Sequence, residues 1–285
     1  MIAASSVRGC RLLFASALLA AVPAFAAPAT VAPAKIQVSP AIDAAVKAST
    51  RDANNVKRDG YRHPAQTLSF FKVAPEKTVI EITPGNGWYS EILAPLLHDK
   101  GHYVAAVVDP MAVAEGRGRD YQQRSRDSLE KKYAAAPAQF GKTAVVAYDP
   151  AKPVFGPASS ADVVLTFRNV HNWRKAGQAQ GMFQGFFNVL KPGGVLGVVE
   201  HRAKADVADD DDTGYVGQQQ VIAMAEAAGF KLDARSEVNA NPRDTKDHPN
   251  GVWTLPPTNQ HDKADDAKYQ AIGESDRMTL RFIKP

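Results

Sequence analysis

Short apolar runs that alternate with helical patterns constrain the fold of this chain more than any other feature. Most of the runs are apolar along their whole length, which is typical of strands buried on both faces of a parallel sheet. The first five runs are residues 78–82, 103–108, 144–148, 162–167 and 195–200. The apolar residues between the runs recur at helical spacing, which favours an α/β fold with helices on both faces of the sheet.

The flanking segments extend the same architecture. We expect helices at 88–97, 118–134, 178–190 and 215–228, one of about three turns from Pro40, and a short one from His63-Pro64. Residues 231–238 predict a sixth strand, and the alternating residues 276–284 predict an antiparallel last strand. The predicted fold class is therefore a doubly wound, Rossmann-like α/β sheet of seven strands, mostly parallel with an antiparallel last strand, plus N-terminal helices.

The first 26 residues have the pattern of a secretory signal peptide. Two arginines precede the short apolar run 12–22, and Ala24-Phe25-Ala26 follows as a small-residue cleavage site. We expect cleavage after Ala26, an Ala/Pro-rich tether at 27–40, and one domain over 41–285. The run is too short to span a membrane and no later stretch approaches that length. The sequence thus predicts an exported, periplasmic protein with no integral membrane segment after the leader is removed.

The composition disfavours several kinds of site and partner. The only cysteine, Cys10, lies inside the leader, so the mature chain can hold neither a disulfide nor a cysteine metal site. The acidic run 209–212 is typical of a solvated loop, and we predict no metal site. The chain has 34 basic and 30 acidic side chains, and the leader takes two arginines away. Basic residues at 117–132 alternate with acidic ones, which indicates a solvated helix face. We therefore predict a small-molecule substrate and no nucleic-acid partner.

A glycine turn after the first strand marks the expected ligand site. Residues 83–87 read Thr-Pro-Gly-Asn-Gly and connect a buried-looking strand directly to a helix. Ligands of doubly wound sheets bind outside the carboxyl ends of the strands, beside the first strand. The segments expected to meet at that edge are 83–88, 109–111, 148–151, 168–173 and 200–202.

Three familiar motifs do not fit this turn. A dinucleotide-binding G-x-G-x-x-G motif needs a third glycine where this chain has Ser90, and the bulky Trp88 and Tyr89 would crowd a pyrophosphate. No Gly-Lys-Ser/Thr follows, as a P-loop requires, and no G-x-S-x-G of a serine hydrolase occurs. An NAD(P)-dependent oxidoreductase is therefore kept only as a disfavoured alternative.

Read together with Glu81, the turn resembles the acidic, glycine-rich loop of class I S-adenosylmethionine-dependent methyltransferases. Thr83 stands where that family has its first glycine, and Pro84 stiffens the turn. The resemblance continues over about residues 60–285, through segments 162–173 and 190–202. Within the superfamily the chain is most similar to a group of exported predicted methyltransferases that carry a Thr-Leu-Pro-Pro-Thr segment, here Thr254 to Thr258.

This resemblance implies a cofactor, S-adenosyl-L-methionine, and a set of residues around it. Glycines allow the backbone to approach the methionine part, and Asp109 would accept hydrogen bonds from the ribose hydroxyls. Tyr148 and Asp149 follow the third strand, where the family contacts adenine. The full set of expected cofactor-binding residues is Glu81, Thr83, Gly85, Asn86, Gly87, Asp109, Met111, Tyr148, Asp149 and Arg168. Glu81 has an equally good alternative role as a brace that accepts hydrogen bonds inside the loop.

Three side chains are candidates for catalysis. His171 and His201 follow the fourth and fifth strands, so both should face the crevice, where either is a candidate general base or a structural hydrogen-bonding group. Tyr215 and the segment 239–257 are expected to form a lid over the substrate, because so long a segment without regular structure is unusual in a compact domain.

The resulting functional prediction is methyl transfer to a small molecule in the cell envelope. Methyl transfer is an in-line displacement, so much of the catalysis can be positioning of the two reactants. Export would take the enzyme away from the compartment that makes its cofactor. A binding protein that keeps the fold and crevice without transferring a methyl group is therefore the main alternative.

Overall fold

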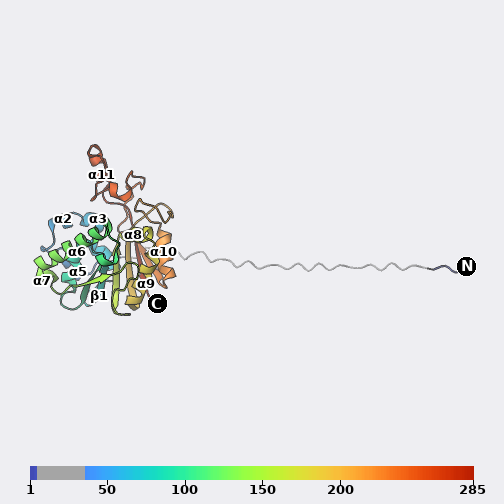
Figure 1. The fold of residues 1–285 in the computed structure, drawn as a ribbon, viewed down its shortest axis with the longest axis horizontal. Coiled ribbons are helices and arrows are strands. Elements are labelled where there is room, and N and C mark those ends of the chain that lie inside the picture. The colour runs from blue at the N-terminus through green and yellow to red at the C-terminus, as the bar shows by residue number, and fades with distance from the viewer. Residues whose placement is uncertain (5–35) are drawn as a thin grey trace. The chain divides into compact units, whose positions relative to one another are not determined.

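Seven strands form one continuous sheet in the order β3-β2-β1-β4-β5-β7-β6 (Figure 1). The computed structural model describes residues 1–4 and 36–285. The strands are β1 (Thr78–Ile82), β2 (His102–Val108), β3 (Ala144–Tyr148), β4 (Ala161–Phe167), β5 (Leu190–His201), β6 (Lys231–Ser236) and β7 (Arg277–Ile283). Residues 5–35, which hold most of the predicted signal peptide and of the tether, lie outside the described residues, so both stay predictions.

The pairing of the strands confirms the predicted fold class. β1 pairs in parallel with β2 and β4, and the parallel pairing continues to β3 on one side and to β5 on the other. β7 is antiparallel to both of its neighbours, β5 and β6. A classic dinucleotide-binding sheet has six strands in the order 3-2-1-4-5-6. The inserted antiparallel β7 therefore separates this sheet from that architecture and weakens the oxidoreductase alternative.

Helices cover both faces of the sheet (Figure 1). One layer contains α1 (Pro40–Val46), α4 (Pro64–Phe70), α5 (Ser90–Leu97), α6 (Arg117–Ala135) and α7 (Pro137–Phe140). The opposite layer contains α8 (Val170–Lys175), α9 (Ala179–Val189) and α10 (Gln218–Ala227). Successive residues of β1 supply the two cores in turn, because side chains of a strand alternate between faces: Val79 packs in the first layer, and Ile80 and Ile82 pack in the second.

Several predicted boundaries need correction. The helix from Pro40 has seven residues, about two turns rather than three, and it ends at Val46. β5 begins at Leu190 instead of residue 195, so Lys191–Gly194 lies within the strand, where its pairing with β4 shifts register. β6 ends at Ser236, two residues early. Short elements without a periodic apolar stripe were not expected: α2 (Ala53–Val56), α3 (Asp59–Arg62), η1 (Pro110–Ala112), η3 (Lys263–Asp265) and α11 (Asp266–Ile272).

The segment predicted as a lid follows β6. It contains one turn of 3-10 helix, η2 (Gly251–Thr254), and buries Asn239, Asp244 and Leu255. Together with α11 it lies beyond the end of the sheet, above α8 in the view of Figure 1. Among the helices of residues 36–285, none is long and apolar enough to cross a membrane.

Candidate active site

The turn between β1 and α5 is built from residues with left-handed backbone. Thr83, Gly85 and Gly87 have φ angles of +52°, +56° and +71°. A Cβ on Gly87 would lie 3.0 Å from Cδ1 of Leu129, whereas a Cβ on Gly85 would meet no heavy atom within 4 Å in the described part of the chain. Gly85 therefore presents bare backbone to open space, which is the property that close approach of a ligand requires.

Thr83 holds the turn in place despite its unfavourable conformation. A β-branched residue with positive φ is an outlier, because its Cβ crowds the backbone. Its backbone N–H donates to the Ala106 carbonyl at 2.8 Å, and its Oγ1 lies 2.8 Å from the Tyr148 hydroxyl. These two bonds connect the turn to β2 and to the end of β3. The predicted site residues Thr83 and Tyr148 are thus direct neighbours.

Glu81 points away from the open face of the turn. Its carboxylate is buried in the layer of α5 and α6, where it accepts hydrogen bonds from the Tyr103 hydroxyl at 2.6 Å and from Oγ of Ser90 at 3.4 Å. The Tyr133 hydroxyl donates to the same serine oxygen at 2.8 Å. Burial raises the pKa of Glu81 to about 7, although Tyr103 and Ser90 oppose the rise. These contacts are those of a brace; a cofactor contact by Glu81 stays a prediction.

Asp109 and Asp149 occupy equivalent positions after β2 and β3. Each carboxylate accepts a hydrogen bond from the backbone N–H two residues later, at 3.0 Å from Met111 and at 2.8 Å from Ala151. Both aspartates are half-buried, and Met111 is 72 % exposed. Because those bonds use one oxygen of each carboxylate, the other oxygen of Asp109 and of Asp149 is available to a ligand.

A shallow, open pocket adjoins the turn. It is lined by Thr83, Pro84 and Gly85, by the end of β2, and by Gln122, Ser125 and Arg126 of α6. The predicted residue Asn86 is exposed beside it, and its carbonyl accepts from Nζ of Lys132 at 3.1 Å. The glycine turn, the end of β2 and the α6 side chains therefore line one open region, and Asp109 directly follows the β2 residues that line it.

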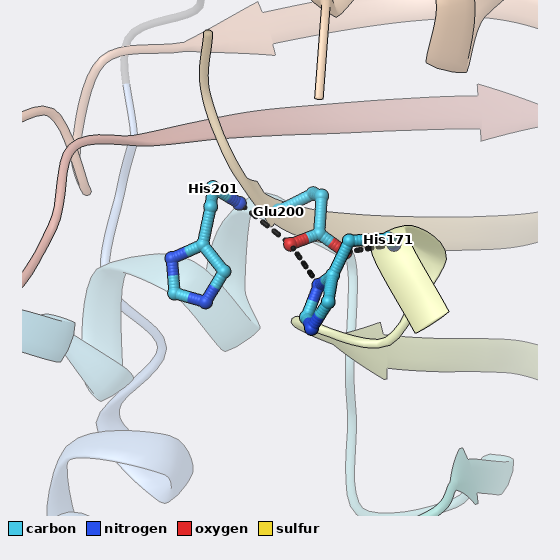
Figure 2. A group of neighbouring side chains, drawn as sticks. All are labelled: His171, Glu200 and His201. Atoms are coloured by element: carbon cyan, nitrogen blue, oxygen red, sulfur yellow. Dashed lines mark hydrogen bonds and ion pairs between the residues drawn. The ribbon is translucent and has the colours of Figure 1, made fainter. Parts of the chain in front are cut away.

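A second group of side chains gathers at the carboxyl ends of β4 and β5 (Figure 2). The fully buried carboxylate of Glu200 lies on β5 and accepts three N–H bonds. The backbone of His201 donates at 2.7 Å, the backbone of His171 at 3.3 Å, and Nδ1 of His171 lies 3.1 Å from Oε1 of Glu200. His171 comes from α8, so this carboxylate fixes a helix to a strand end.

The Glu200 carboxylate sets which nitrogen of His171 is free. A hydrogen on Nδ1 donates to the carboxylate, and Nε2 then keeps its lone pair. The two imidazole rings lie 5.4 Å apart, and Nδ1 of His201 lies 2.5 Å from Oγ of Ser275. Burial lowers the pKa of His201 well below its ordinary value, with further lowering by His171 and Arg277, so His201 is neutral at pH 7. Because His201 resists protonation, His171, with its Nδ1 on the Glu200 carboxylate, is the better candidate to accept a proton from a bound molecule.

The same three residues could also be considered for a metal ion. His171, Glu200 and His201 each offer a ligand atom, and these atoms lie within 4.8 Å of one another. Ligand atoms around a tetrahedral zinc ion lie only about 3.3 Å apart, given metal–ligand distances near 2.0 Å. The observed arrangement corresponds more closely to a hydrogen-bonded carboxylate–histidine pair.

Tyr215 connects the core to the predicted lid. Its hydroxyl donates to both oxygens of Asp244, at 2.9 and 3.0 Å, and Nε2 of His248 lies 2.8 Å from the same carboxylate. Burial and the neighbouring Asp244 raise the pKa of Tyr215, so the hydroxyl stays protonated. Trp253 of the same segment stands edge-on to His171 with ring centroids 6.0 Å apart. The segment therefore packs beside His171; a catalytic role for Tyr215 stays a prediction.

Sequence reasoning missed several residues at this edge. Glu200 carries a recognisable signal, because it is an acidic residue inside an otherwise apolar strand run, next to a candidate histidine. No such signal marks Glu274, which lies far along the chain from three of the four arginines that pair with it: Arg58, Arg62 and Arg168, with Arg277 beside it.

Comparison with solved structures places the fold. A S-adenosylmethionine-dependent methyltransferase from Aquifex aeolicus superposes with a TM-score of 0.54 at 14 % identity, covering 80 % of this chain and 93 % of that one. The [4+2]-cyclase SpnF gives 0.54 at 16 % identity, with 84 % and 85 % covered. A putative sarcosine dimethylglycine methyltransferase from Galdieria sulphuraria gives 0.52 at 11 %, with 87 % and 92 % covered. This chain has the class I methyltransferase fold.

No protein-family model matches the sequence, and no curated protein matches it. At these identities the methyltransferase fold is the shared property, and the presence of a cyclase among the similar structures shows that the fold alone does not fix the reaction. The activity must therefore be argued from the residues of the site.

Proposed function

We propose that this protein transfers a methyl group from S-adenosyl-L-methionine to a small molecule in the cell envelope. The observation that carries the proposal is the open glycine turn beside Asp109, next to the His171–Glu200 pair on the neighbouring strand ends. A ligand-accessible turn and a carboxylate-bound histidine at one edge of a methyltransferase sheet support this proposal. The location in the envelope rests on the predicted signal peptide.

The residues of the first region fit the cofactor. Bare backbone at Gly85 suits the methionine part, and the available oxygen of Asp109 suits a ribose hydroxyl. Asp149, one strand further out, suits the base. When bound, S-adenosylmethionine supplies a methyl group made reactive by its sulfonium. The protein has to hold that methyl in line with the acceptor atom, which is mainly a positioning task.

The histidines complete the chemistry where the acceptor must lose a proton. Nε2 of His171 would take the proton while Nδ1 donates to Glu200, so the buried carboxylate stabilises the imidazolium that forms. Trp253 and the lid segment exclude water from this proton transfer. A nucleophile without a proton to lose would need only the positioning.

A binding protein without methyl transfer is the second candidate. Thr83 favours it, because a β-branched residue and Pro84 stand where the methyltransferase loop usually has a glycine. A turn that is too stiff to admit the methionine part would keep the crevice but lose the reaction.

Isothermal titration calorimetry with S-adenosylmethionine and S-adenosylhomocysteine tests the proposal. We expect both to bind the wild type, and Asp109→Ala to lose about 1–3 kcal/mol of binding free energy, the scale of an unmade hydrogen-bonding arrangement. Asp99→Ala, at the opposite end of β2, is the matched control and should bind like the wild type. If the folded wild type binds neither nucleoside, the methyltransferase proposal is wrong.

A further inference from the structure

Four arginines converge on one carboxylate beside the histidines. Glu274 is 2 % exposed, and Nε of Arg58 and of Arg62 lie 2.7 and 3.3 Å from its oxygens. Nη1 of Arg168 lies 3.8 Å from the same group, and Arg277 donates to it through Nη2. We call these five residues the arginine cluster. Arg62 lies on α3 and Arg58 just before it, Arg168 follows β4, and Glu274 and Arg277 lie just before and at the start of β7.

The arginine cluster carries more positive than negative charge. Within the described residues, Glu274 is the carboxylate that all four guanidinium groups share, which leaves three positive charges without a counter-charge. Burial and the nearby arginines lower the pKa of Arg62, and burial followed by Arg277 lowers the pKa of Arg168 to about 10. Desolvated cations at this spacing repel each other, and a bound anion would relieve that repulsion.

Unused donors accompany this charge. In residues 36–285, Nη2 of Arg58 and Nε of Arg277 are buried and have no hydrogen-bond partner. The whole Arg277 residue is only 3 % exposed, so water does not reach it freely. Buried donors of charged groups are normally satisfied, because an unmade bond there costs the full desolvation of the group. The cluster therefore has donors to spare for a ligand as well as charge.

A small pocket adjoins the arginine cluster. Arg62, Arg168 and Arg277 line it together with Tyr89 and Phe167, whose rings stack with centroids 3.7 Å apart. Arg277 on β7 is the register partner of His201 on β5. Residues opposite each other in a sheet lie on the same face about 5 Å apart. A group held at Arg277 would therefore lie next to the imidazoles.

We propose that the arginine cluster binds the carboxylate or phosphate of a small molecule. Planar guanidinium groups bind such oxyanions through paired, charge-assisted hydrogen bonds. Two molecules can supply this chemistry: an anionic methyl acceptor, an assignment that rests on the proposed function, and the methionine carboxylate of the cofactor. An acceptor held this way would present its reacting atom to His171 and His201.

Titration with inorganic phosphate tests the site without a known substrate. We expect saturable binding by the full-length wild type, weakened at least tenfold in Arg168→Gln and partly restored in Arg168→Lys, which keeps the charge but not the fork. Arg168 is suitable because its side chain is 26 % exposed, so the fold should tolerate its replacement. Arg119→Gln, which removes a surface guanidinium paired with Glu115, is the control and should bind normally. Absence of saturable binding by folded wild type, or equal binding by Arg168→Gln, overturns the site.

Competition between phosphate and the nucleosides distinguishes the two possible sources of the bound anion, the methyl acceptor and the cofactor. Phosphate that weakens binding of S-adenosylmethionine but not of 5′-methylthioadenosine, the nucleoside without the amino-acid tail, assigns the cluster to the cofactor and overturns the acceptor assignment. Phosphate that weakens neither assigns the cluster to the acceptor. Phosphate binding without binding of either nucleoside overturns the proposed function and leaves the anion site standing. Nucleoside binding without phosphate binding overturns the anion site and leaves the proposed function standing.

Discussion

The carboxyl edge of the sheet has two halves that are built differently. At the ends of β2 and β3, the carboxylates of Asp109 and Asp149 accept bonds only from their own turns among the described residues, and Met111 extends into solvent. At the ends of β4, β5 and β7, by contrast, Glu200 and Glu274 are buried and bonded to groups from several elements. In the first half, polar groups remain available for hydrogen bonds to a ligand. In the second half, the polar groups are already hydrogen-bonded to other protein groups.

The difference suggests that one half recognises a ligand and the other holds side chains ready for chemistry. A half-exposed aspartate pays little desolvation before it binds a hydroxyl, so the open half suits a ligand that arrives and leaves. A buried carboxylate that already accepts three N–H bonds orients a histidine without further reorganisation, which is the property expected of a site for chemistry. The similar solved structures share the sheet, and the prebuilt half is where this chain can differ from them.

The largest expected effect compares the two halves directly. Glu200→Ala removes three hydrogen bonds to a buried anion, and we expect a loss of about 3–5 kcal/mol in the free energy of unfolding, because hydrogen bonds to charged groups are worth more than neutral ones. Asp109→Ala removes one local cap and should cost about 1 kcal/mol. Urea unfolding of both variants provides the measurement. Equal losses would show that the two halves are not built differently.

A second effect concerns Glu81, the buried glutamate of β1 below the glycine turn. Glu81 is buried there with a pKa raised to about 7, while an unfolded chain has the ordinary value near 4.5. Between these values the folded state holds a proton that the unfolded state has lost, so stability falls as pH rises from 4.5 to 7. The full shift corresponds to at most about 3 kcal/mol.

Glu81→Gln should remove that pH dependence. The variant keeps an oxygen that can accept from Tyr103, and its stability relative to the wild type should increase from pH 4.5 to pH 7 and stay constant above. Glu237→Gln, on an exposed side chain paired with Arg202, is the control and should leave the pH profile unchanged. A wild-type and a Glu81→Gln profile that run parallel would contradict a buried, protonated Glu81.

The same contrast explains what the sequence could predict. The strands and the open half depend on local patterns: apolar runs, glycines in a turn, and an aspartate at a strand end. Their positions follow from the chain order of a doubly wound sheet. Glu274 and Arg62 are 212 residues apart in sequence, and neither stands in a pattern that indicates its partner. Glu81 illustrates a different limit, since strand alternation gives its face only once the layer above it is known.

The smallest expected effect concerns the turn itself. Thr83→Gly relieves a left-handed threonine, worth about 1–2 kcal/mol, but it also loses the bond to Tyr148 and makes the unfolded chain more flexible. The net change in unfolding free energy should therefore stay below about 1 kcal/mol. Tyr148→Phe removes the same bond without relieving the backbone, so it should destabilise more than Thr83→Gly does. If thermal or urea unfolding gives the opposite order, the turn is not strained, and stiffness at Thr83 gives no reason to favour a binding protein over an enzyme. If the expected order holds, calorimetry of Thr83→Gly with S-adenosylmethionine shows whether that strain limits entry of the cofactor.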